Sequence, residues 1–338
     1  MKILIDAFGG DNSPQEVIAG TVAAVKERKG FTAVLVGDKD VLDVHISRYG
    51  YPQDRIEILD AKQVITCEEE PTVAVRKKPD STICKAFKEL KENDDAMAFV
   101  SAGSTGAVLV GATLKLGRIK GVARPALCPI LPTLSGKNVL LMDSGANADC
   151  KPVNLCQFAV MATVYAKALG IENPKVALLS NGTEDEKGNA LCHEVFPFLK
   201  ECKEINFIGN MEARDIISGD ADIVIADGFS GNIALKSLEG GVKTVLAALK
   251  DAIYGSCFGK IGGLFLKKRL KGLKDKLDYN KKGGALFIGV NKPVIKAHGS
   301  SKRLAFKNAI LQAVDYAEFD LADKITESLV NSGLADAK

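Results

Sequence analysis

The sequence predicts an α/β protein in which a mainly parallel β-sheet is covered by helices on both faces. Three observations lead to this prediction. Short apolar, β-branched runs alternate with longer amphipathic patterns along the chain. The runs are apolar throughout, which is typical of strands that are buried on both faces. The composition, with 46% hydrophobic and 26% charged residues among 338, is that of a folded chain with enough apolar surface for a core.

The predicted strands share this apolar, β-branched character. In chain order they cover residues 2–6, 32–37, 55–59, 96–101, 138–142, 175–179, 205–208 and 222–226, with a short pair at 285–288 and 294–295. Helices are predicted at residues 14–28, 39–48, 81–91, from 232 to about 277, and at 302–329. We expect Ser13 to cap the first helix and Pro14 to lie in its first turn, because a serine oxygen accepts terminal N–H groups and proline has no N–H to leave unpaired.

The chain shows no obvious boundary between domains. Its length permits one large domain or two smaller ones, but no repeat or low-complexity linker divides it. Residues 117–136 carry three prolines, yet they are too apolar for a flexible linker and are expected to pack on the body. We therefore expect residues 1–338 to form a single domain with a helical arm at about 235–280.

Charge and composition argue against several classes of protein. A net charge of +3 is too small for a dedicated nucleic-acid binder. The eight cysteines show no Cys-x-x-Cys pair and no zinc-type spacing with histidine, so we expect reduced thiols in the cytoplasm. The N-terminus lacks the features of a secretory signal, and no apolar run reaches the ~18–20 residues of a membrane span. With three histidines in the chain, a mechanism that needs several of them is disfavoured.

Polar, glycine-rich segments follow six of the predicted strands, and ligands bind at the carboxyl ends of strands in such sheets. In residues 101–107 the glycines let the backbone approach a ligand, two hydroxyls are available, and a helix with free N–H groups follows. The segment is not a Walker A loop, and no Gly-x-Gly-x-x-Gly follows a strand, so a nicotinamide dinucleotide is disfavoured. A plain helix cap and tight turn is the alternative. The candidate phosphate-binding residues are Ser101, Gly103, Ser104, Thr105 and Gly106.

Three further residues are candidates for catalysis, each with a structural alternative. Lys187 lies in a loop beside three carboxylates and either stabilises charge in a transition state or is a solvated cation. Asn232 follows two glycines and either donates a hydrogen bond to the reacting group or caps a helix. His298 is followed by a glycine and two serines and is either a catalyst or a structural hydrogen-bonding group.

Other kinds of catalytic centre are disfavoured. No Gly-x-Ser-x-Gly elbow is present, and the cysteines have the character of small core residues. Inorganic phosphate is a nucleophile that needs little activation, and a thiolate leaves a thioester readily because a thiol pKa is about 8.5. Such a transfer needs positioning and an oxyanion hole more than a strong base. Four aspartates at strand ends suggest Mg²⁺, but each is equally explained as a turn cap, so no metal is expected at Asp6, Asp11, Asp143 and Asp227.

Nine segments, in one order along essentially the whole chain, resemble a known family. They include SAGSTGA at 101–107, GTEDEKGN at 182–189, DGFSGN at 227–232 and KAHGS at 296–300, and the others lie at 6–12, 117–121, 124–127, 143–147 and 206–210. In these segments the chain resembles the bacterial phosphate acyltransferases, the acyl-carrier-protein:phosphate transacylases of phospholipid synthesis. It departs from them at Phe8 and Ser104, where the family often has Met and Asn.

The resemblance implies a Rossmann-like α/β/α sandwich, a homodimer, and reversible transfer of a long-chain fatty acyl group from acyl carrier protein to inorganic phosphate. The acyl phosphate would then pass to a membrane glycerol-3-phosphate acyltransferase. The resemblance also implies that Lys187 stabilises charge on phosphate or the oxyanion, that Asn232 donates a hydrogen bond to the same centre, and that residues 103–106 cradle phosphate. It implies no cofactor and no metal. A catalytic role for His298 is inferred from the residues alone.

The net charge of +3 conceals an uneven distribution. Residues 260–276 contain seven Lys or Arg and one Asp, a charge of +6, which leaves −3 on the rest of the chain. Apolar residues beside a dense basic run are typical of a segment on an anionic membrane, and they also suit an acidic partner such as acyl carrier protein. An amphipathic helix packed on the body or across a dimer is the alternative. We expect peripheral contact with the inner face of the cell membrane, or with the carrier, through Phe258, Leu264, Phe265, Leu266, Lys267, Lys268, Arg269 and Lys271.

Two other functions remain open at this point. A phosphotransacetylase-like enzyme that uses acyl-coenzyme A needs a pocket for adenine and pantetheine, which the sequence does not exclude. A non-catalytic, membrane-associated module that binds acyl carrier protein would not require six polar strand ends.

Overall fold

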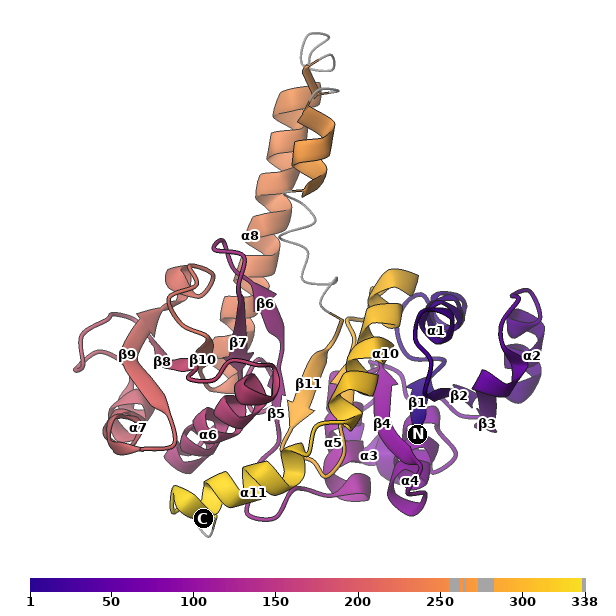
Figure 1. Cartoon of the computed structure of the whole chain (residues 1–338), viewed down its shortest axis with the longest axis horizontal. Helices are drawn as coiled ribbons and strands as arrows, with labels where there is room; N and C mark the ends of the chain where they lie inside the picture. Colours follow the sequence, from indigo (N-terminus) through magenta and orange to yellow (C-terminus); the bar gives the residue numbers. More distant parts are fainter. Residues whose placement is uncertain (256–261, 264–265, 273–282, 336–338) are drawn as a thin grey trace.

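The computed structural model describes residues 1–255, 262–263, 266–272 and 283–335, and within them the strands form two sheets (Figure 1). All described strand pairings are parallel except those of β11 and of β6. The larger sheet joins, in spatial order, β3 (Ile56–Asp60), β2 (Thr32–Gly37), β1 (Lys2–Asp6), β4 (Ala96–Ser101), β12 (Val294–Lys296), β11 (Ala285–Ile288) and β5 (Ala126–Cys128). The smaller sheet joins β6 (Ile130–Pro132), β7 (Asn138–Met142), β10 (Ile223–Ile225), β8 (Lys175–Ser180) and β9 (Asn206–Glu212).

Helices cover both faces of each sheet, so the predicted α/β fold with a mainly parallel arrangement is confirmed. Alternate residues of one strand enter different cores, as the period of two requires: Ile3 and Ile5 belong to one buried cluster and Leu4 to another. The helices of the body are α1 (Gln15–Glu27), α2 (Lys39–Ile46), α3 (Pro71–Lys77), α4 (Thr82–Glu92), α5 (Thr105–Gly111), α6 (Pro152–Ala168), α7 (Ala190–Glu201), α10 (Arg303–Ala317) and α11 (Leu321–Asn331). Short helical turns lie at η1 (Gln53–Arg55), η2 (Ala112–Leu116) and η3 (Ala213–Asp215).

The division into two sheets is not part of the prediction. It depends on residues 117–136, which pack on the body as expected but also contain β5 and β6. Pro129 separates these two short strands, and each lies at the edge of a different sheet. Residues of both sheets nevertheless belong to one buried apolar cluster, which includes Ile5 of β1 and Ile223 of β10. A single domain over residues 1–338 is in keeping with this cluster and remains a prediction.

The predicted helical arm is present and protrudes from the body (Figure 1). Its main element is α8 (Gly228–Tyr254), whose 27 residues extend about 40 Å. Residues 266–272 are also helical, and the Tyr254 hydroxyl donates a hydrogen bond to the Gly263 carbonyl. In α8 the described buried residues are Gly228, Gly231 and Glu239, all in its first half. The base of α8 is therefore part of the body, and its distal half is exposed in this chain.

Two predictions about helix ends are wrong. Ser13 does not cap α1, because its hydroxyl donates to the carbonyl of Gly10 and the residue before the helix is Pro14. The predicted helix at 302–329 is two helices, since α10 ends at Ala317 and α11 begins at Leu321. The break lets α11 change direction and pack against α6, at the opposite end of the body from the arm (Figure 1).

Candidate functional site

A cavity of about 370 Å³ lies between the two sheets, where β4, β7 and β12 present their carboxyl ends. We call it the inter-sheet cavity. One part of its lining is polar and includes Thr105, Asn232, Lys236, Glu239, Lys296 and His298. The other part is apolar and includes Leu127, Pro129, Ile130, Leu131, Leu235 and Ala285. A site with a cationic side and an apolar side suits a ligand that carries both an anionic group and a hydrocarbon group.

Asn232 reaches the cavity because the first turn of α8 lies directly against the end of β7. A Cβ atom on Gly231 would lie 1.9 Å from the carbonyl oxygen of Asp143, so a glycine is required at this contact. Asn232 follows it and lies over Gly145, whose φ of 132° is in the region that favours glycine. The helix cap is Asp227, whose carboxylate accepts hydrogen bonds from the Ser230 N–H and hydroxyl at 2.8 Å. The alternative in which Asn232 caps a helix is therefore wrong.

Asp143 holds the loop on the other side of this contact. Its carboxylate accepts backbone N–H bonds from Leu127, Gly145, Ala146 and Asn147, and another from the Asn147 side chain. These donors occupy the carboxylate, which acts as a turn cap, as does that of Asp227. Within the described residues, no group of three or more His, Cys, Asp and Glu side chains could hold a metal ion.

Most of the predicted phosphate-binding residues have structural roles, and one of them lines the cavity. Ser101 is buried, donates to the Asp6 carboxylate at 2.7 Å and accepts the Gly103 N–H at 3.0 Å. Ser104 caps α5 by accepting the Ala107 N–H, and a Cβ on Gly106 would meet Pro71 at 2.6 Å. Thr105 is the member of the predicted set that lines the cavity.

Asp6 is the acceptor around which this turn is built. Burial raises the pKa of its carboxyl above the ordinary value, which the hydrogen bond from Ser101 partly opposes. A Cβ atom on Gly9 would lie 2.5 Å from the Asp6 carboxylate and 2.7 Å from the Gly103 nitrogen. The backbone at Gly103 therefore approaches the loop after β1, and this part of the segment forms a cap and tight turn.

His298 lines the cavity at the end of β12. Its Nδ1 accepts the N–H of Ser300 at 3.2 Å, so the proton of the neutral ring is on Nε2. Burial, with a smaller contribution from the Lys236 charge, lowers the pKa of His298 below its ordinary value. The ring is therefore neutral at pH 7 and has a donor at Nε2.

Two residues of α8 and one of β12 complete the polar part of the cavity, and they are not among the residues that the sequence predicts for the site. Lys236 pairs with the buried Glu239 one helical turn later, at 3.0 Å. Lys296 is 9% exposed, and burial lowers its pKa to about 8. A lysine between Ile295 and Ala297, in a strand that is otherwise apolar, is the signal that could have identified it, because lysine is seldom fully buried.

Lys187 does not line the inter-sheet cavity. It is exposed, its aliphatic part lies over Gly182, and its carbonyl accepts a hydrogen bond from the Asn210 side chain. Its neighbours Gly188 and Asn189 line a second cavity of about 740 Å³. The first turns of α8 separate the two cavities, since Ser230, Ile233, Ala234, Ser237 and Leu238 line the second one.

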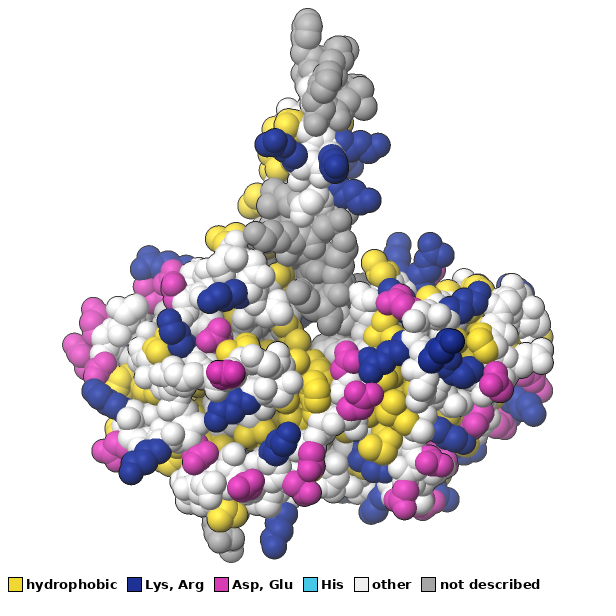
Figure 2. Space-filling view, in the orientation of Figure 1, with side chains coloured by type: hydrophobic (Ala, Val, Ile, Leu, Met, Phe, Trp, Pro, Cys, Tyr) yellow, Lys and Arg dark blue, Asp and Glu magenta, His cyan; other side chains and the backbone are white. Residues whose placement is uncertain are grey.

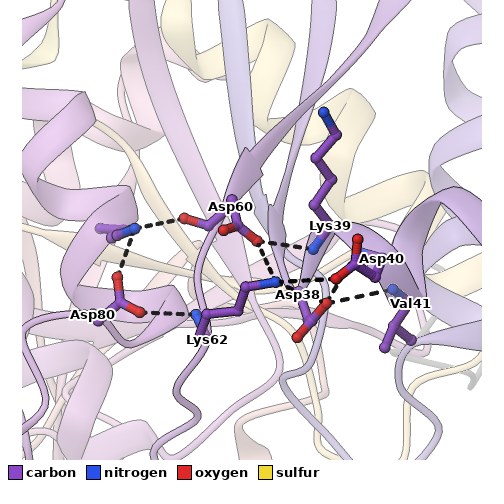
Figure 3. Close-up of polar contacts among 8 residues, drawn as sticks. Asp38, Lys39, Asp40, Val41, Asp60, Lys62 and Asp80 are labelled. Carbon is purple, nitrogen blue, oxygen red and sulfur yellow. Dashed lines mark hydrogen bonds and ion pairs between the residues drawn. The ribbon is translucent and has the colours of Figure 1, made fainter.

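A cluster of charges at the ends of β2 and β3 is structural (Figure 3). Lys62 pairs with Asp38 at 3.2 Å and with Asp60 at 3.1 Å, and hydrogen bonds to these two carboxylates raise its pKa above the ordinary range. Asp38 also caps α2, and Asp80 accepts the Lys62 backbone N–H. Carboxylates outnumber lysines in this cluster, so it fastens loops and is not a second anion site.

The arm carries the basic residues that were predicted to contact membrane or carrier. Leu266 is 43% exposed, and Lys267, Lys268, Arg269 and Lys271 are exposed. Figure 2 shows Lys, Arg and hydrophobic side chains on the visible part of the arm. The predicted contacts Phe258, Leu264 and Phe265 lie outside the described residues. Within the described part of the chain, no helix is long and apolar enough to cross a membrane.

The chain has full-length relatives among known proteins. A family model described as fatty acid synthesis protein matches residues 1–324. A phosphate acyltransferase of Clostridium novyi is 47% identical over 326 residues, which cover 96% of this chain and 97% of that protein. A phosphate acyltransferase of Brevibacillus brevis is 43% identical over 343 residues, which cover 100% of both chains.

Solved structures show the fold. The EutD phosphotransacetylase of Staphylococcus aureus has a TM-score of 0.58 at 16% identity and covers 96% of this chain and 94% of its own. A branched-chain phosphotransacylase of Enterococcus faecalis also has a TM-score of 0.58 at 16% identity, covering 94% of this chain and 99% of its own. These likenesses confirm a Rossmann-like α/β fold. From the family model and the full-length relatives, the chain is an acyltransferase and belongs to the phosphate acyltransferase family.

Proposed function

We propose that this enzyme transfers a long-chain fatty acyl group reversibly from acyl carrier protein to inorganic phosphate, with acyl phosphate as the product for phospholipid synthesis. The observation that carries the proposal is the inter-sheet cavity, where two lysines and an asparagine face an apolar wall. The cations suit the phosphate, and the wall of Leu127, Ile130 and Leu235 suits the start of the acyl chain.

In the forward direction, a phosphate oxygen attacks the thioester carbonyl carbon. The new C–O bond forms as the carbonyl becomes an oxyanion, and the C–S bond then breaks with its electron pair leaving on sulfur. We assign Asn232 as the donor to the oxyanion, because its side chain lies on the cavity wall at the rigid contact between α8 and β7. His298, neutral with its proton on Nε2, is the second candidate donor. No strong base is needed, since phosphate is already anionic and the leaving thiol has an ordinary pKa of about 8.5.

Lys187 is proposed as a further charge stabiliser of the phosphate or oxyanion. Its loop borders the second cavity, on the other side of α8 from Asn232. The role therefore requires that the loop of residues 181–189 approach the reacting group when acyl carrier protein binds. Lys187→Ala should lower kcat without unfolding the protein. A wild-type rate in this variant would remove Lys187 from the mechanism.

We further propose that the arm brings the enzyme to its partners. The exposed basic residues 267–271 would attract the acidic acyl carrier protein and the anionic inner face of the cell membrane. Peripheral binding there would place a cytoplasmic enzyme, acting as a homodimer, where a membrane glycerol-3-phosphate acyltransferase consumes acyl phosphate.

The decisive assay separates this function from its alternatives. The protein is mixed with palmitoyl-acyl carrier protein and phosphate, and free thiol is measured. We expect phosphate-dependent release. Release from palmitoyl-coenzyme A at an equal or higher kcat/KM would favour the phosphotransacetylase-like alternative, to which the two solved transacylase folds give weight. No release from either donor would favour a non-catalytic carrier-binding module.

A further inference from the structure

Lys296 is a buried lysine whose ammonium group is only partly paired inside the inter-sheet cavity. The residue is 9% exposed and lines the cavity. Its Nζ donates one hydrogen bond, to the carbonyl of Ala297, and within the described residues it forms no ion pair with a carboxylate. Because an ammonium group has three N–H donors, two of them have no partner in the described part of the chain. Burying a charge in this state is costly, so the arrangement indicates a ligand that supplies acceptors.

The charged groups that face Lys296 do not replace such a ligand. Asp6, on β1, already accepts two hydrogen bonds from its own neighbourhood. Glu239, on α8, is paired with Lys236, which is itself a cation. Asp11 acts on Lys296 only through longer-range attraction. Asp6 and Asp11 do not line the cavity, and among the described residues that do, the two lysines outnumber the single carboxylate of Glu239.

The neutral groups nearby are also suited to an anion. Thr105 and Asn232 each bring a side-chain donor to the lining, and the His298 ring carries its proton on Nε2. We propose that Lys296 is the principal anion-binding residue of the cavity, and that the two N–H groups for which the described residues offer no partner bind oxygens of the phosphate acceptor. In the reverse direction they would bind the same oxygens in acyl phosphate. The identity of the anion as a substrate rests on the proposed function, but the binding site does not.

A direct binding experiment tests the site. Binding of inorganic phosphate is measured by titration calorimetry for the wild-type protein and for Lys296→Met, which keeps the length of the side chain and removes its charge. Loss of charge-assisted hydrogen bonds should weaken phosphate binding roughly 10- to 100-fold. Unchanged affinity in a folded Lys296→Met protein would overturn the proposal.

Lys292→Met is the matched control. Lys292 lies just before the same strand, is also partly buried, and donates to the carbonyls of Asn93 and Ala96 at the opposite end of the sheet. Its replacement should leave phosphate affinity at the wild-type value. An equal loss of phosphate affinity in both variants would show that the effect comes from general destabilisation, and it would contradict the proposal.

Kinetics distinguish failure of this inference from failure of the proposed function. In the thiol-release assay, Lys296→Met should raise the KM for phosphate by the same factor, while the KM for palmitoyl-acyl carrier protein stays within about 2-fold of the wild-type value. Phosphate-dependent release with an unchanged KM for phosphate would overturn the inference alone. Absence of release in the wild type would overturn the proposed function, and calorimetry would still decide whether Lys296 binds the anion.

A measurement on the wild-type protein covers the case in which Lys296→Met does not fold. Lysines are acetylated with acetic anhydride in the presence of either phosphate or an equal ionic strength of chloride, and modified peptides are quantified by mass spectrometry. Phosphate should protect Lys296 and leave Lys292 unaffected. Equal modification of Lys296 in both salts would overturn the proposal.

Discussion

Gly231→Ala should displace the first turn of α8 and thereby lower the rate of catalysis. The substitution adds a Cβ atom 1.9 Å from the Asp143 carbonyl oxygen, where contacts under 3.0 Å are essentially never seen, so the first turn of α8 must move by about 1 Å. Overpacking of this kind costs about 1–3 kcal/mol of the free energy of unfolding. Because Asn232 moves with the helix, and a displacement of 1 Å can cost roughly 100-fold in rate, we expect kcat for thiol release to fall by about that factor.

Controls for this prediction lie on the same helix. Gly240 and Gly241 have no heavy atom within 4 Å of an added Cβ, so alanine at either position should keep kcat. Each replacement should also increase the free energy of unfolding by up to about 1 kcal/mol, because alanine favours the helix. Urea denaturation gives the stability, and thiol release gives kcat. A folded Gly231→Ala protein with the kcat of the wild type would refute the argument that this contact positions Asn232.

Three further predictions concern charge, capping and the arm. Burial, with a smaller contribution from the Lys236 charge, lowers the pKa of Lys296 to about 8, and attraction to Cys67, Asp6 and Asp11 only partly opposes this. Lys296 therefore loses its proton as the pH rises through about 8, and kcat/KM for phosphate should fall up to tenfold per pH unit above that value. Lys296→Met should abolish this limb of the profile. A wild-type profile that is flat from pH 7 to about 10 would contradict it. Asp227→Ala removes the cap of α8 and should lower the free energy of unfolding by about 1 kcal/mol in urea titrations; an unchanged value would contradict the capping role. Leu266→Asp should weaken flotation with anionic liposomes. The control is Leu304→Asp, at a comparably exposed apolar residue of the body, which should float as the wild type does. Equal flotation of Leu266→Asp and wild type would argue against membrane contact by the arm.

The strands were predictable because their local sequence carries the signal. Ile3 to Ile5 are apolar in succession, as a strand between two cores requires. The two-sheet arrangement depends on β5 and β6, whose three residues each are too few for periodicity. Helix α6 was not predicted because it is apolar on all sides, so it lacks the amphipathic pattern by which a surface helix is recognised.

The site was partly predictable for a related reason. Thr105, Asn232 and His298 follow strands, and the carboxyl ends of parallel strands meet at one edge. Lys187 also follows a strand of the smaller sheet, but the first turns of α8 stand between its loop and the cavity, which a pattern along the chain does not reveal. Lys296 and Glu239 gain their significance from burial, and burial of a single charged residue depends on tertiary packing.

Phosphate-dependent acyl transfer in the inter-sheet cavity is what we propose for this enzyme. The most direct test is ³¹P NMR of palmitoyl-acyl carrier protein and phosphate incubated with the wild-type protein or with Asn232→Ala. We expect an acyl phosphate resonance that appears with the wild type and forms much more slowly with the folded variant. No such resonance with the wild type and an active donor would contradict acyl transfer to phosphate, and equal rates for the two proteins would contradict the role of Asn232.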